Sequence, residues 1–363
     1  MKIITITGIR PDFIRMSKIF KKFDNNFEHI LIHTGQHYDK MLSSVFFEEL
    51  DIRKPDYNLE IGGVGKEHFH QAADLSVKII ELIRKEKLSP NLICFLGDSN
   101  SVTAAIPLKK EGYKIAHIEA GMRSYDKRMF EEINRTVCDH CSDYLFVYHE
   151  NYKQKAMKEN ISEDQIFVVG NTIVEVAKDM QEIMFQHPKT NSHIILDIHR
   201  PENFNDKKRM KNIIEYANNM STVYDLPVKM LNFGRTEQKI AQYQIKMRGI
   251  DIIPLMSYKS YIESVYNSLF IISDSGTGQE EPALFNTPVI VPRDFTERPE
   301  SVESNCSVML DVNSLYNSTW TQSIKYIDCI LDGGTIKIDT KWLGDGNTSD
   351  LIVNKIKELY KNG

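Results

Sequence analysis

Three carboxylates in the first half of the chain follow predicted strands and could transfer protons. Asp98 comes just after the apolar run of residues 91–96, and Glu119 comes just after the run of residues 114–118. Glu131 begins the helix predicted next. Parallel sheets bind ligands at the carboxyl ends of their strands, so these side chains should gather at one rim. Carboxylates held close together raise one another's pKa values and can act as acid and base.

Each of these carboxylates also has a purely structural interpretation. Asp98 could cap a helix that starts at Ser99, and the sequence leaves this alternative open. Glu131 and Glu132 could be acids of a first helical turn, where they favour the helix dipole, and this interpretation is preferred for Glu132. Glu119 precedes a pair of small residues and has no evident capping role, so a chemical role is favoured.

A second group of residues, in the other half of the chain, has the character of a phosphate site. The apolar run of residues 269–272 ends in a turn that contains Ser275 and Gly276, and a helix is predicted over residues 279–285. A strand, a small-residue turn and a helix start place backbone N–H groups where a phosphate can bind. Glu281 could accept hydrogen bonds from a ribose diol, and Arg298 would add positive charge. An ordinary βαβ turn is the alternative.

Arg10 and His199 stand after strands in the same way. Arg10 follows the strand predicted over residues 3–7, and His199 follows the strand of residues 194–198. Charged residues flank His199, which disfavours a core histidine but leaves a surface ion cluster as an alternative. Arginines stabilise negative charge on a leaving phosphate. Carboxylates in one half and phosphate ligands in the other suit a reaction that breaks a sugar–phosphate bond and moves a proton.

No metal site is predicted. Cys138 and Cys141 have metal-like spacing, with His140 between them, but no second pair of ligands follows. A structural zinc ion needs four ligands, so packing within a helix is the preferred interpretation of these cysteines.

The elements that would position these residues alternate between strand and helix along the whole chain. This pattern predicts an α/β protein with parallel sheets covered on both faces. A hinge is expected near residues 170–172. We therefore predict an N-terminal Rossmann-like domain of residues 1–170, completed by a C-terminal helix of residues 347–363, and a second Rossmann-like domain of residues 171–346. Strands are predicted at residues 3–7, 29–33, 91–96, 114–118, 144–148, 166–169, 193–197, 227–231, 251–254, 269–272 and 288–291.

Length and composition agree with two domains. The chain has 363 residues, which is longer than a single hydrophobic core usually serves. Its net charge of −5 argues against a broad nucleic-acid surface. No apolar run approaches the roughly 20 residues of a membrane span, so no membrane association is expected. Five cysteines do not make a disulfide framework, and a cytoplasmic location is expected.

Ten short motifs, in order and spread over nearly the whole chain, resemble the UDP-N-acetylglucosamine 2-epimerase family. Several independent blocks are far more specific than one glycine turn. The motifs are GIRPDFIRMS from Gly8, HTGQHYD from His33, LGDSNS from Leu96, HIEAGMRSYD from His117, EEINR from Glu131, VGNT from Val169, HRPEN from His199, SDSGTGQEE from Ser273, RDFTERPE from Arg293 and GDGNTS from Gly344.

The resemblance implies two Rossmann-like domains in a GT-B arrangement, with UDP in the crevice between them, and a homodimer that needs no cofactor. It implies a non-hydrolysing isomerase that interconverts UDP-N-acetylglucosamine and UDP-N-acetylmannosamine for surface polysaccharide. UDP would be eliminated to give a 2-acetamidoglucal and then added back. The implied catalytic residues are Asp98, Glu119, Glu131 and His199. The implied substrate-binding residues are Arg10, Arg15, Ser275, Gly276, Glu281 and Arg298.

Some positions depart from the family pattern. Arg15 stands where many members have lysine, which keeps the charge but changes the geometry. Asp39 stands where members activated by a second UDP-N-acetylglucosamine have glutamine, so such activation is not expected. The alternatives that remain are a 2-epimerase of a related UDP-2-acetamido (deoxy) sugar, such as a UDP-N-acetylfucosamine precursor, a hydrolysing 2-epimerase, a GT-B glycosyltransferase, and a UDP-sugar-binding sensor.

Overall fold

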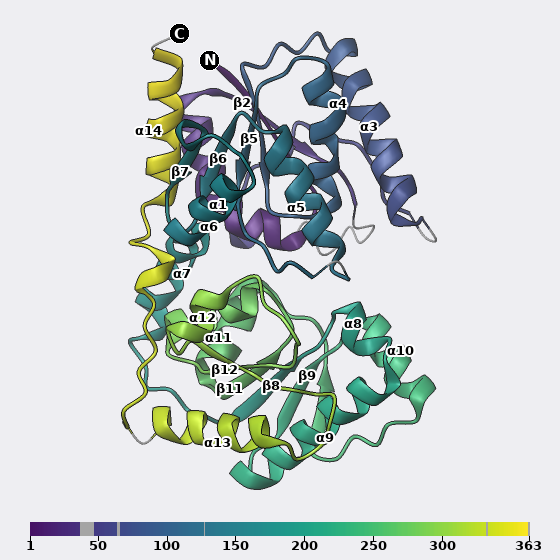
Figure 1. Ribbon diagram of the computed structural model, residues 1–363, viewed down its shortest axis with the longest axis vertical. Coiled ribbons are helices and arrows are strands. Elements are labelled where there is room, and N and C mark those ends of the chain that lie inside the picture. Colours follow the sequence, from purple (N-terminus) through teal and green to yellow (C-terminus); the bar gives the residue numbers. More distant parts are fainter. Residues whose placement is uncertain (37–46, 64–65, 127, 332, 362–363) are drawn as a thin grey trace. The chain divides into compact units, whose positions relative to one another are not determined.

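The computed structural model describes residues 1–36, 47–63, 66–126, 128–331 and 333–361 (Figure 1). The chain divides into two compact units. Unit 1 comprises Met1–Val176 and Leu343–Gly363, and unit 2 comprises Ala177–Trp342. Each is an α/β unit built on a parallel sheet, which confirms the predicted fold class. None of the described helices is both long enough and apolar enough to cross a membrane.

The described part of unit 1 contains a seven-stranded sheet in the order β3-β2-β1-β4-β5-β6-β7. All of its strand pairs are parallel. Continuous runs of β-branched and aromatic residues form strands that are buried on both faces, which is why helices must cover both faces. The strands are β1 (Lys2–Thr7), β2 (Glu28–His33), β3 (Tyr57–Asn58), β4 (Leu92–Leu96), β5 (Ile115–Ile118), β6 (Tyr144–Val147) and β7 (Ile166–Val168).

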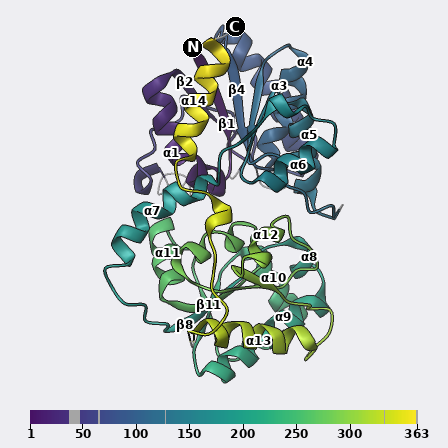
Figure 2. The ribbon, with the colours of Figure 1, turned by 60° about the vertical axis from the view of Figure 1, so that its left-hand side comes forward.

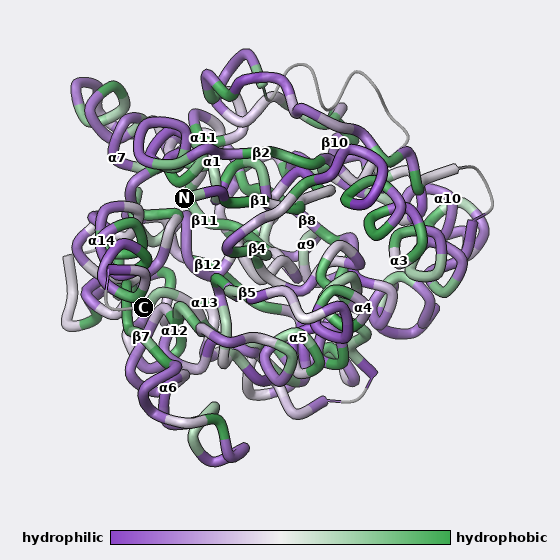
Figure 3. The backbone as a smooth tube through the Cα atoms, turned by 90° about the horizontal axis from the view of Figure 1, so that it is seen from above, coloured by the Kyte–Doolittle hydropathy of each residue, from purple (hydrophilic) through white to green (hydrophobic). Residues whose placement is uncertain are grey.

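Helices cover the two faces of this sheet in two groups. One core cluster joins the strands to helices α1, α6 and α14, and another joins them to α3, α4 and α5. Helix α3 buries every fourth residue, and its alternating hydrophilic and hydrophobic stretches are visible in Figure 3. The helices are α1 (Arg10–Asn26), α3 (His68–Lys85), α4 (Ala105–Lys110), α5 (Phe130–Cys141), α6 (Glu150–Lys158) and α14 (Thr348–Lys361), with the 3₁₀ helices η1 (Asn100–Ala104) and η2 (Glu163–Gln165). Helix α7 (Thr172–Met184) begins in unit 1 and ends in unit 2.

The C-terminal helix α14 packs on unit 1 beside α1 (Figure 2). Lys22 Nζ donates to Asp350 at 2.6 Å, and buried Ile352 and Ile356 join the core. The chain returns to unit 1 next to the start of α7. There Asn171 N donates to Leu343 O at 2.7 Å.

The described part of unit 2 contains a six-stranded parallel sheet in the order β10-β9-β8-β11-β12-β13. Its strands are β8 (His193–Asp197), β9 (Val228–Leu231), β10 (Ile250–Ile253), β11 (Ser268–Ser273), β12 (Val289–Val291) and β13 (Ser307–Met309). Its helices are α8 (Pro201–Phe204), α9 (Lys207–Tyr224), α10 (Gly234–Tyr243), α11 (Tyr258–Asn267), α12 (Pro299–Glu303) and α13 (Ser318–Leu331), with the 3₁₀ helices η3 (Thr277–Gln279), η4 (Pro282–Phe285) and η5 (Lys341–Leu343).

Each sheet has a point where the strand order reverses. The chain winds outward in opposite directions from the pair β1 and β4 in unit 1, and from the pair β8 and β11 in unit 2. The connections that leave the two strands of such a pair diverge and leave room for a ligand at the carboxyl ends. The candidate residues after these four strands are therefore where an α/β sheet binds its ligand.

Two predictions about local structure were wrong. The helix predicted over residues 279–285 is replaced by the short 3₁₀ helices η3 and η4. Pro282 lies within that stretch, and it has no N–H to donate to a continuous helix. The short edge strands β3 and β13 were not predicted. Asp39 lies outside the described residues, as do His37 and Tyr38 of the motif HTGQHYD.

Candidate functional site

A pair of carboxylates in unit 1 is bridged by one buried arginine. Asp98 follows β4 and Glu119 follows β5, and Arg135 on α5 lies between them with no exposed surface. Arg135 Nη2 contacts Asp98 Oδ2 closely and lies 3.3 Å from Glu119 Oε1. Ser99 caps η1 by accepting from Ser101 N, so the alternative of Asp98 as the helix cap is wrong.

A second buried arginine holds the other oxygen of Glu119. Arg15 on α1 pairs through Nη1 with Glu119 Oε2, and its guanidinium lies 5.9 Å from the centre of the Tyr148 ring. We call Asp98, Glu119, Arg15 and Arg135 the carboxylate site. Two guanidinium groups compensate two carboxylates there, which is the condition under which charges tolerate burial.

The backbone of Glu119 is in a conformation that side chains rarely adopt. Its φ is +66°, in the left-handed region. This region costs a residue other than glycine roughly 1–2 kcal/mol. Such strain persists where surrounding contacts determine the position, and it gathers at functional sites. The strain therefore supports a chemical role for Glu119.

Glu131 and Arg10 share helices with residues of the carboxylate site, Glu131 with Arg135 on α5 and Arg10 with Arg15 on α1. Glu131 is half-buried on α5, one helical turn before Arg135 and on the same face. Arg10 is the first residue of α1, at the carboxyl end of β1, and is also half-buried. Glu132 accepts from Ser124 N, Ser124 Oγ and Tyr125 N, each at 2.9 Å, so it holds a loop.

Sequence reasoning missed one titratable group of this region. Asp12, on the first turn of α1, is only 3% exposed and accepts from Ser99 Oγ at 3.2 Å. Burial, together with the negative charge of Asp98, raises the pKa of Asp12 to about 7. An acidic residue in the first turn of a helix is usually explained by its favourable interaction with the helix dipole, so Asp12 did not stand out in the sequence.

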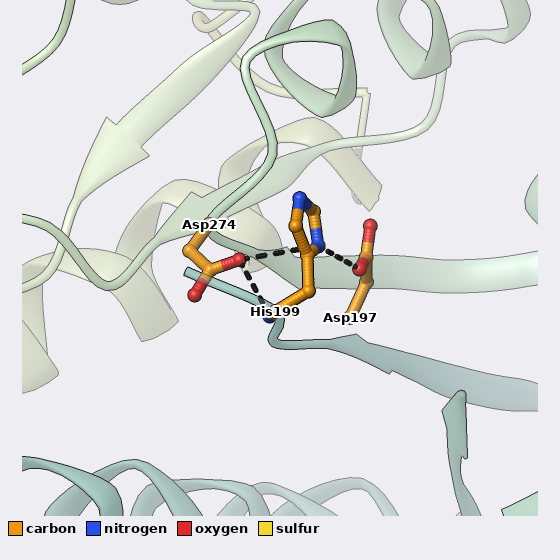
Figure 4. A group of neighbouring side chains, drawn as sticks. All are labelled: Asp197, His199 and Asp274. Atoms are coloured by element: carbon orange, nitrogen blue, oxygen red, sulfur yellow. Dashed lines mark hydrogen bonds and ion pairs between the residues drawn. The ribbon is translucent and has the colours of Figure 1, made fainter. Parts of the chain in front are cut away.

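In unit 2, His199 is held by two aspartates, Asp197 at the end of β8 and Asp274 directly after β11 (Figure 4). Its Nδ1 donates to Asp197 Oδ1 at 2.9 Å and lies 3.5 Å from Asp274 Oδ1. The other ring nitrogen points away from both carboxylates (Figure 4). Burial lowers the pKa of His199, but the charges of Asp197 and Asp274 outweigh it, so the pKa is raised. The ring can therefore carry positive charge and present one N–H.

Asp197, His199 and Asp274 have the spacing of metal ligands, since their ligand atoms lie within 4.8 Å of one another. Asp274 accepts from the backbone N–H groups of His199 and Arg200 at 3.0 and 3.1 Å. Asp197 Oδ2 accepts from Ser273 Oγ at 3.0 Å. Both carboxylates already accept hydrogen bonds from the protein. The three residues therefore support the loop after β8 better than they would bind a metal ion.

The turn after β11 contains Ser275 and Gly276. A Cβ atom at Gly276 would lie 2.5 Å from Arg298 Nη1 and 2.8 Å from Glu297 Oε1, so a larger residue would displace these side chains. Ser275 N donates to Ser273 Oγ at 3.1 Å. The small residues thus let buried side chains approach the backbone of the turn, which we call the glycine turn (residues 275–278).

Arg298, which sequence reasoning assigned to the substrate, packs beneath the glycine turn. It is 3% exposed, and it donates through Nε to Glu280 Oε1 at 2.6 Å and through Nη1 to Glu297 Oε1 at 2.5 Å. Glu281 accepts from the hydroxyl of Tyr258 on α11, and both residues are buried. Burial and the charge of Glu281 raise the pKa of Tyr258 well above its usual range. Tyr258 therefore fixes one oxygen of the proposed ribose ligand.

With both sites described, comparisons with known proteins identify the family. A model of the UDP-N-acetylglucosamine 2-epimerase family matches residues 21–357. The chain belongs to this family. The UDP-N-acetylglucosamine 2-epimerase of Methanocaldococcus jannaschii is 35% identical over 330 residues, which cover 86% of this chain and 89% of that protein.

A second relative and a solved structure match almost the whole chain. The UDP-2,3-diacetamido-2,3-dideoxy-D-glucuronate 2-epimerase of Pseudomonas aeruginosa is 32% identical over 376 residues, covering 99% of this chain and 100% of that protein. The crystal structure of Methanocaldococcus jannaschii UDP-GlcNAc 2-epimerase in complex with UDP-GlcNAc and UDP aligns with a TM-score of 0.88, at 32% identity, over 99% of this chain and 100% of that chain. These matches confirm the family predicted from the motifs.

Arg135 and Tyr258 are functional candidates that sequence reasoning did not assign. Arg135 is the last residue of the motif EEINR, and its spacing of four from Glu131 placed it on the same helix face. That signal was available in the sequence. Tyr258 is 23 residues from Glu281, and no local pattern connects the two.

Proposed function

We propose that the protein is a non-hydrolysing UDP-N-acetylglucosamine 2-epimerase that interconverts UDP-N-acetylglucosamine and UDP-N-acetylmannosamine. The observation that carries the proposal is the carboxylate site, where Asp98 and Glu119 stand at the ends of neighbouring strands and share Arg135. The named activity of the Methanocaldococcus jannaschii relative supports the choice of substrate.

In the proposed reaction, a carboxylate among Asp98, Glu119 and Glu131 removes the proton from C2 of the sugar. The electron pair of the C2–H bond forms the C1–C2 double bond as the C1–O bond breaks and UDP leaves. A proton is then delivered to C2 from the other face, and UDP adds back to C1. Acid–base catalysis of this kind contributes roughly 10²–10⁴-fold to a rate.

The remaining candidates would hold UDP and stabilise it as a leaving group. His199, with its raised pKa, would donate to the diphosphate, and Arg10 and the glycine turn would bind phosphate oxygens. Glu281 would accept from the ribose. Arg15 and Arg298 would act through the residues they contact, Arg15 through Glu119 and Arg298 through the glycine turn.

A related sugar is the second candidate, and the Pseudomonas aeruginosa relative favours it, because that protein is named for a diacetamido sugar and matches 99% of this chain. Proton NMR of the protein with each UDP-sugar in D2O tests both candidates. A second anomeric signal and deuterium at C2 are expected with UDP-N-acetylglucosamine. Release of UDP and free N-acetylmannosamine would show a hydrolysing enzyme. No change with any UDP-sugar, but binding by calorimetry, would show a sensor.

We also propose that the protein forms a homodimer through the face of α3, α4 and α5. Five large apolar side chains on these three helices, which pack against one another, are between 42% and 63% exposed, and exposed apolar surface favours an interface. They are Phe69, Val77, Ile106, Phe130 and Ile133. A cytoplasmic location is proposed because all five cysteines are free.

Light scattering after gel filtration tests the dimer. Ile133→Glu is expected to give a monomer, because it places a charge in the apolar face. Ile183→Glu, at a residue of unit 2 that is 45% exposed, serves as the matched control and should leave the mass unchanged. A parent protein with the mass of a monomer would contradict the proposal.

A further inference from the structure

A buried histidine lies behind the carboxylate site and uses both of its ring nitrogens. His117 on β5 has no exposed surface. Its Nδ1 lies 2.6 Å from Asp139 Oδ1, and its Nε2 lies 2.7 Å from the carbonyl oxygen of Gly97. Both partners are acceptors, so both bonds form only if the ring is an imidazolium. Burial lowers the pKa of His117, but the neighbouring Cys138 sulfur and Asp139 carboxylate outweigh it and raise the pKa to about 10.

The partner of this ring, Asp139, is also fully used. Its Oδ2 accepts from Gly121 N at 3.1 Å and lies 2.7 Å from Arg123 Nη2. Arg123 is held in turn by Glu159, at 2.9 Å from Nε and 2.7 Å from Nη2. The pKa of Asp139 is lowered, since the charges of His117 and Arg123 outweigh its burial.

The two backbone groups that this network binds are next to the carboxylate site. Gly97 directly precedes Asp98, and Gly121 follows Glu119 by two residues. Asp139 also lies on the same helix as Arg135, one turn further along, and on the same face. One face of α5 therefore carries both Arg135, which bridges the two carboxylates, and Asp139, which binds the turn of one carboxylate directly and the turn of the other through His117.

We propose that His117 and Asp139 are positioning residues, which together hold the turn of Asp98 and the strained turn of Glu119 in the arrangement that proton transfer at C2 requires. The inference rests on the proposed function. It explains why an ion pair is kept inside a sheet unit where apolar side chains of similar volume would serve stability as well. It also explains how the left-handed backbone of Glu119 is maintained.

The experiment compares Asp139→Asn with Asp143→Asn. Asp143 is the matched control because it binds the backbone at the opposite end of the same strand, accepting from Ile115 N at 3.0 Å. A misplacement of about 1 Å can cost roughly 10²-fold in rate, so Asp139→Asn is expected to lower kcat about 100-fold. The KM and the Kd for UDP should stay within about twofold, and His117→Gln should behave in the same way. Asp143→Asn is expected to keep kcat within about twofold of the parent.

Three outcomes would overturn the proposal. They are an unchanged kcat in folded Asp139→Asn, an equal loss of kcat in Asp143→Asn, and a neutral His117 in the parent protein. The last is measured by ¹H–¹⁵N NMR of the imidazole groups at pH 8, with His117→Gln to assign the signal, and it needs neither turnover nor a folded Asp139 variant. A neutral ring could not donate to both Gly97 and Asp139. If the parent protein instead shows the imidazolium but epimerises no UDP-sugar, the proposed function fails while the network stands.

Discussion

The carboxylate site of unit 1 and the glycine turn of unit 2 lie at equivalent places in two similar sheets but are built differently. In unit 1, side chains from helices meet side chains at strand ends, as when Arg135 on α5 contacts Asp98 and Glu119. In unit 2, the side chain of Asp274 accepts from backbone N–H groups of the loop after β8. The arrangement in unit 1 fixes the positions of ionisable side chains, and the arrangement in unit 2 fixes the conformation of the backbone.

This difference agrees with the two kinds of chemistry proposed for them. Proton transfer depends on the position and charge of individual carboxylates, so contacts between side chains, which fix both, are suited to it. A diphosphate is bound by several N–H groups at once, so a turn with fixed backbone is suited to that. Buried arginines serve both designs, Arg135 by bridging carboxylates and Arg298 by packing beneath the glycine turn.

The largest effect is expected from Asp98→Asn. Loss of a proton-transfer carboxylate should lower the rate of deuterium incorporation at C2 about 10³-fold. The Kd for UDP should stay within about twofold, because the proposed UDP ligands other than Arg10 lie in unit 2. NMR in D2O and calorimetry measure the two quantities on one sample. An equal loss of UDP affinity would show that the carboxylate site also binds UDP, and would contradict the separation of proton transfer from UDP binding.

Removal of either buried arginine should cost stability to a similar extent in the two units. Arg135→Met removes a buried partner from Asp98 and from Glu119, which keeps Arg15. Arg298→Met removes a buried partner from Glu280 and from Glu297, which keeps Arg293. Breaking a buried ion pair from one side costs roughly 3–5 kcal/mol.

Urea unfolding measures this loss, and Arg84→Met is the matched control. Arg84 pairs with Glu111 at 2.7 Å, but its side chain is 67% exposed, and exposed pairs contribute roughly 0–1 kcal/mol. Equal losses of unfolding free energy in Arg135→Met and Arg84→Met would contradict a stabilising role for the buried contact of Arg135 with Asp98 and Glu119. The two buried variants should then separate by function, Arg135→Met losing exchange at C2 and Arg298→Met losing UDP affinity.

Sequence reasoning succeeded where position along a strand decides the outcome. Asp98, Glu119 and His199 could be placed because each directly follows an apolar strand, and the carboxyl ends of parallel strands share one rim. Their catalytic roles stay predictions. The helix expected over residues 279–285 failed because helical pattern was weighed above the local effect of Pro282.

The contacts that sequence reasoning missed depend on tertiary packing. Asp139 is 18 residues from Gly121 and 22 from His117, and only the packing of α5 against β5 brings them together. The same holds for Tyr258 and Glu281. A residue's type and its neighbours in the chain do not indicate which buried partner it will meet. Arg135 is the exception, since its spacing from Glu131 was visible.

Asp12 gives unit 1 a pH dependence that the glycine turn should lack. The carboxyl group has a folded pKa of about 7 against an ordinary value of 3.8. The folded state therefore binds the proton of Asp12 more tightly, so the contribution of this group to stability is greatest below pH 4, falls as the pH rises to 7, and is constant above. A shift of this size corresponds to about 4 kcal/mol at most.

Asp12→Asn removes this ionisation and should gain stability relative to the parent as the pH rises. Urea unfolding at pH 4 and pH 8 should show the difference between variant and parent moving by about 2–4 kcal/mol in favour of the variant. Ser99→Ala, which removes the hydrogen-bond donor but not the carboxyl group, should keep the pH dependence. A difference between Asp12→Asn and parent that is the same at both pH values would show that folding does not raise the pKa of Asp12.

The smallest effect is expected in the glycine turn, where the change is one methyl group. The φ of Gly276 is −64°, so its backbone accepts alanine, but the added Cβ would meet Arg298 Nη1 at 2.5 Å. Overpacking of this kind costs roughly 1–3 kcal/mol, and if half of the upper value appears in binding, the Kd for UDP rises about tenfold. Gly234→Ala is the matched control, because nothing lies within 4 Å of its Cβ position.

Gly276→Ala should leave the chemistry at C2 unaffected once UDP-sugar is saturating, because the carboxylate site is untouched. A tenfold higher KM with kcat within about twofold of the parent is therefore expected, the opposite of the result expected for Asp98→Asn. Steady-state kinetics over a wide range of UDP-sugar concentration separates the two quantities. If kcat falls as steeply as affinity, the backbone of the turn also stabilises UDP as it leaves, and the glycine turn would belong to the chemical step as well as to binding.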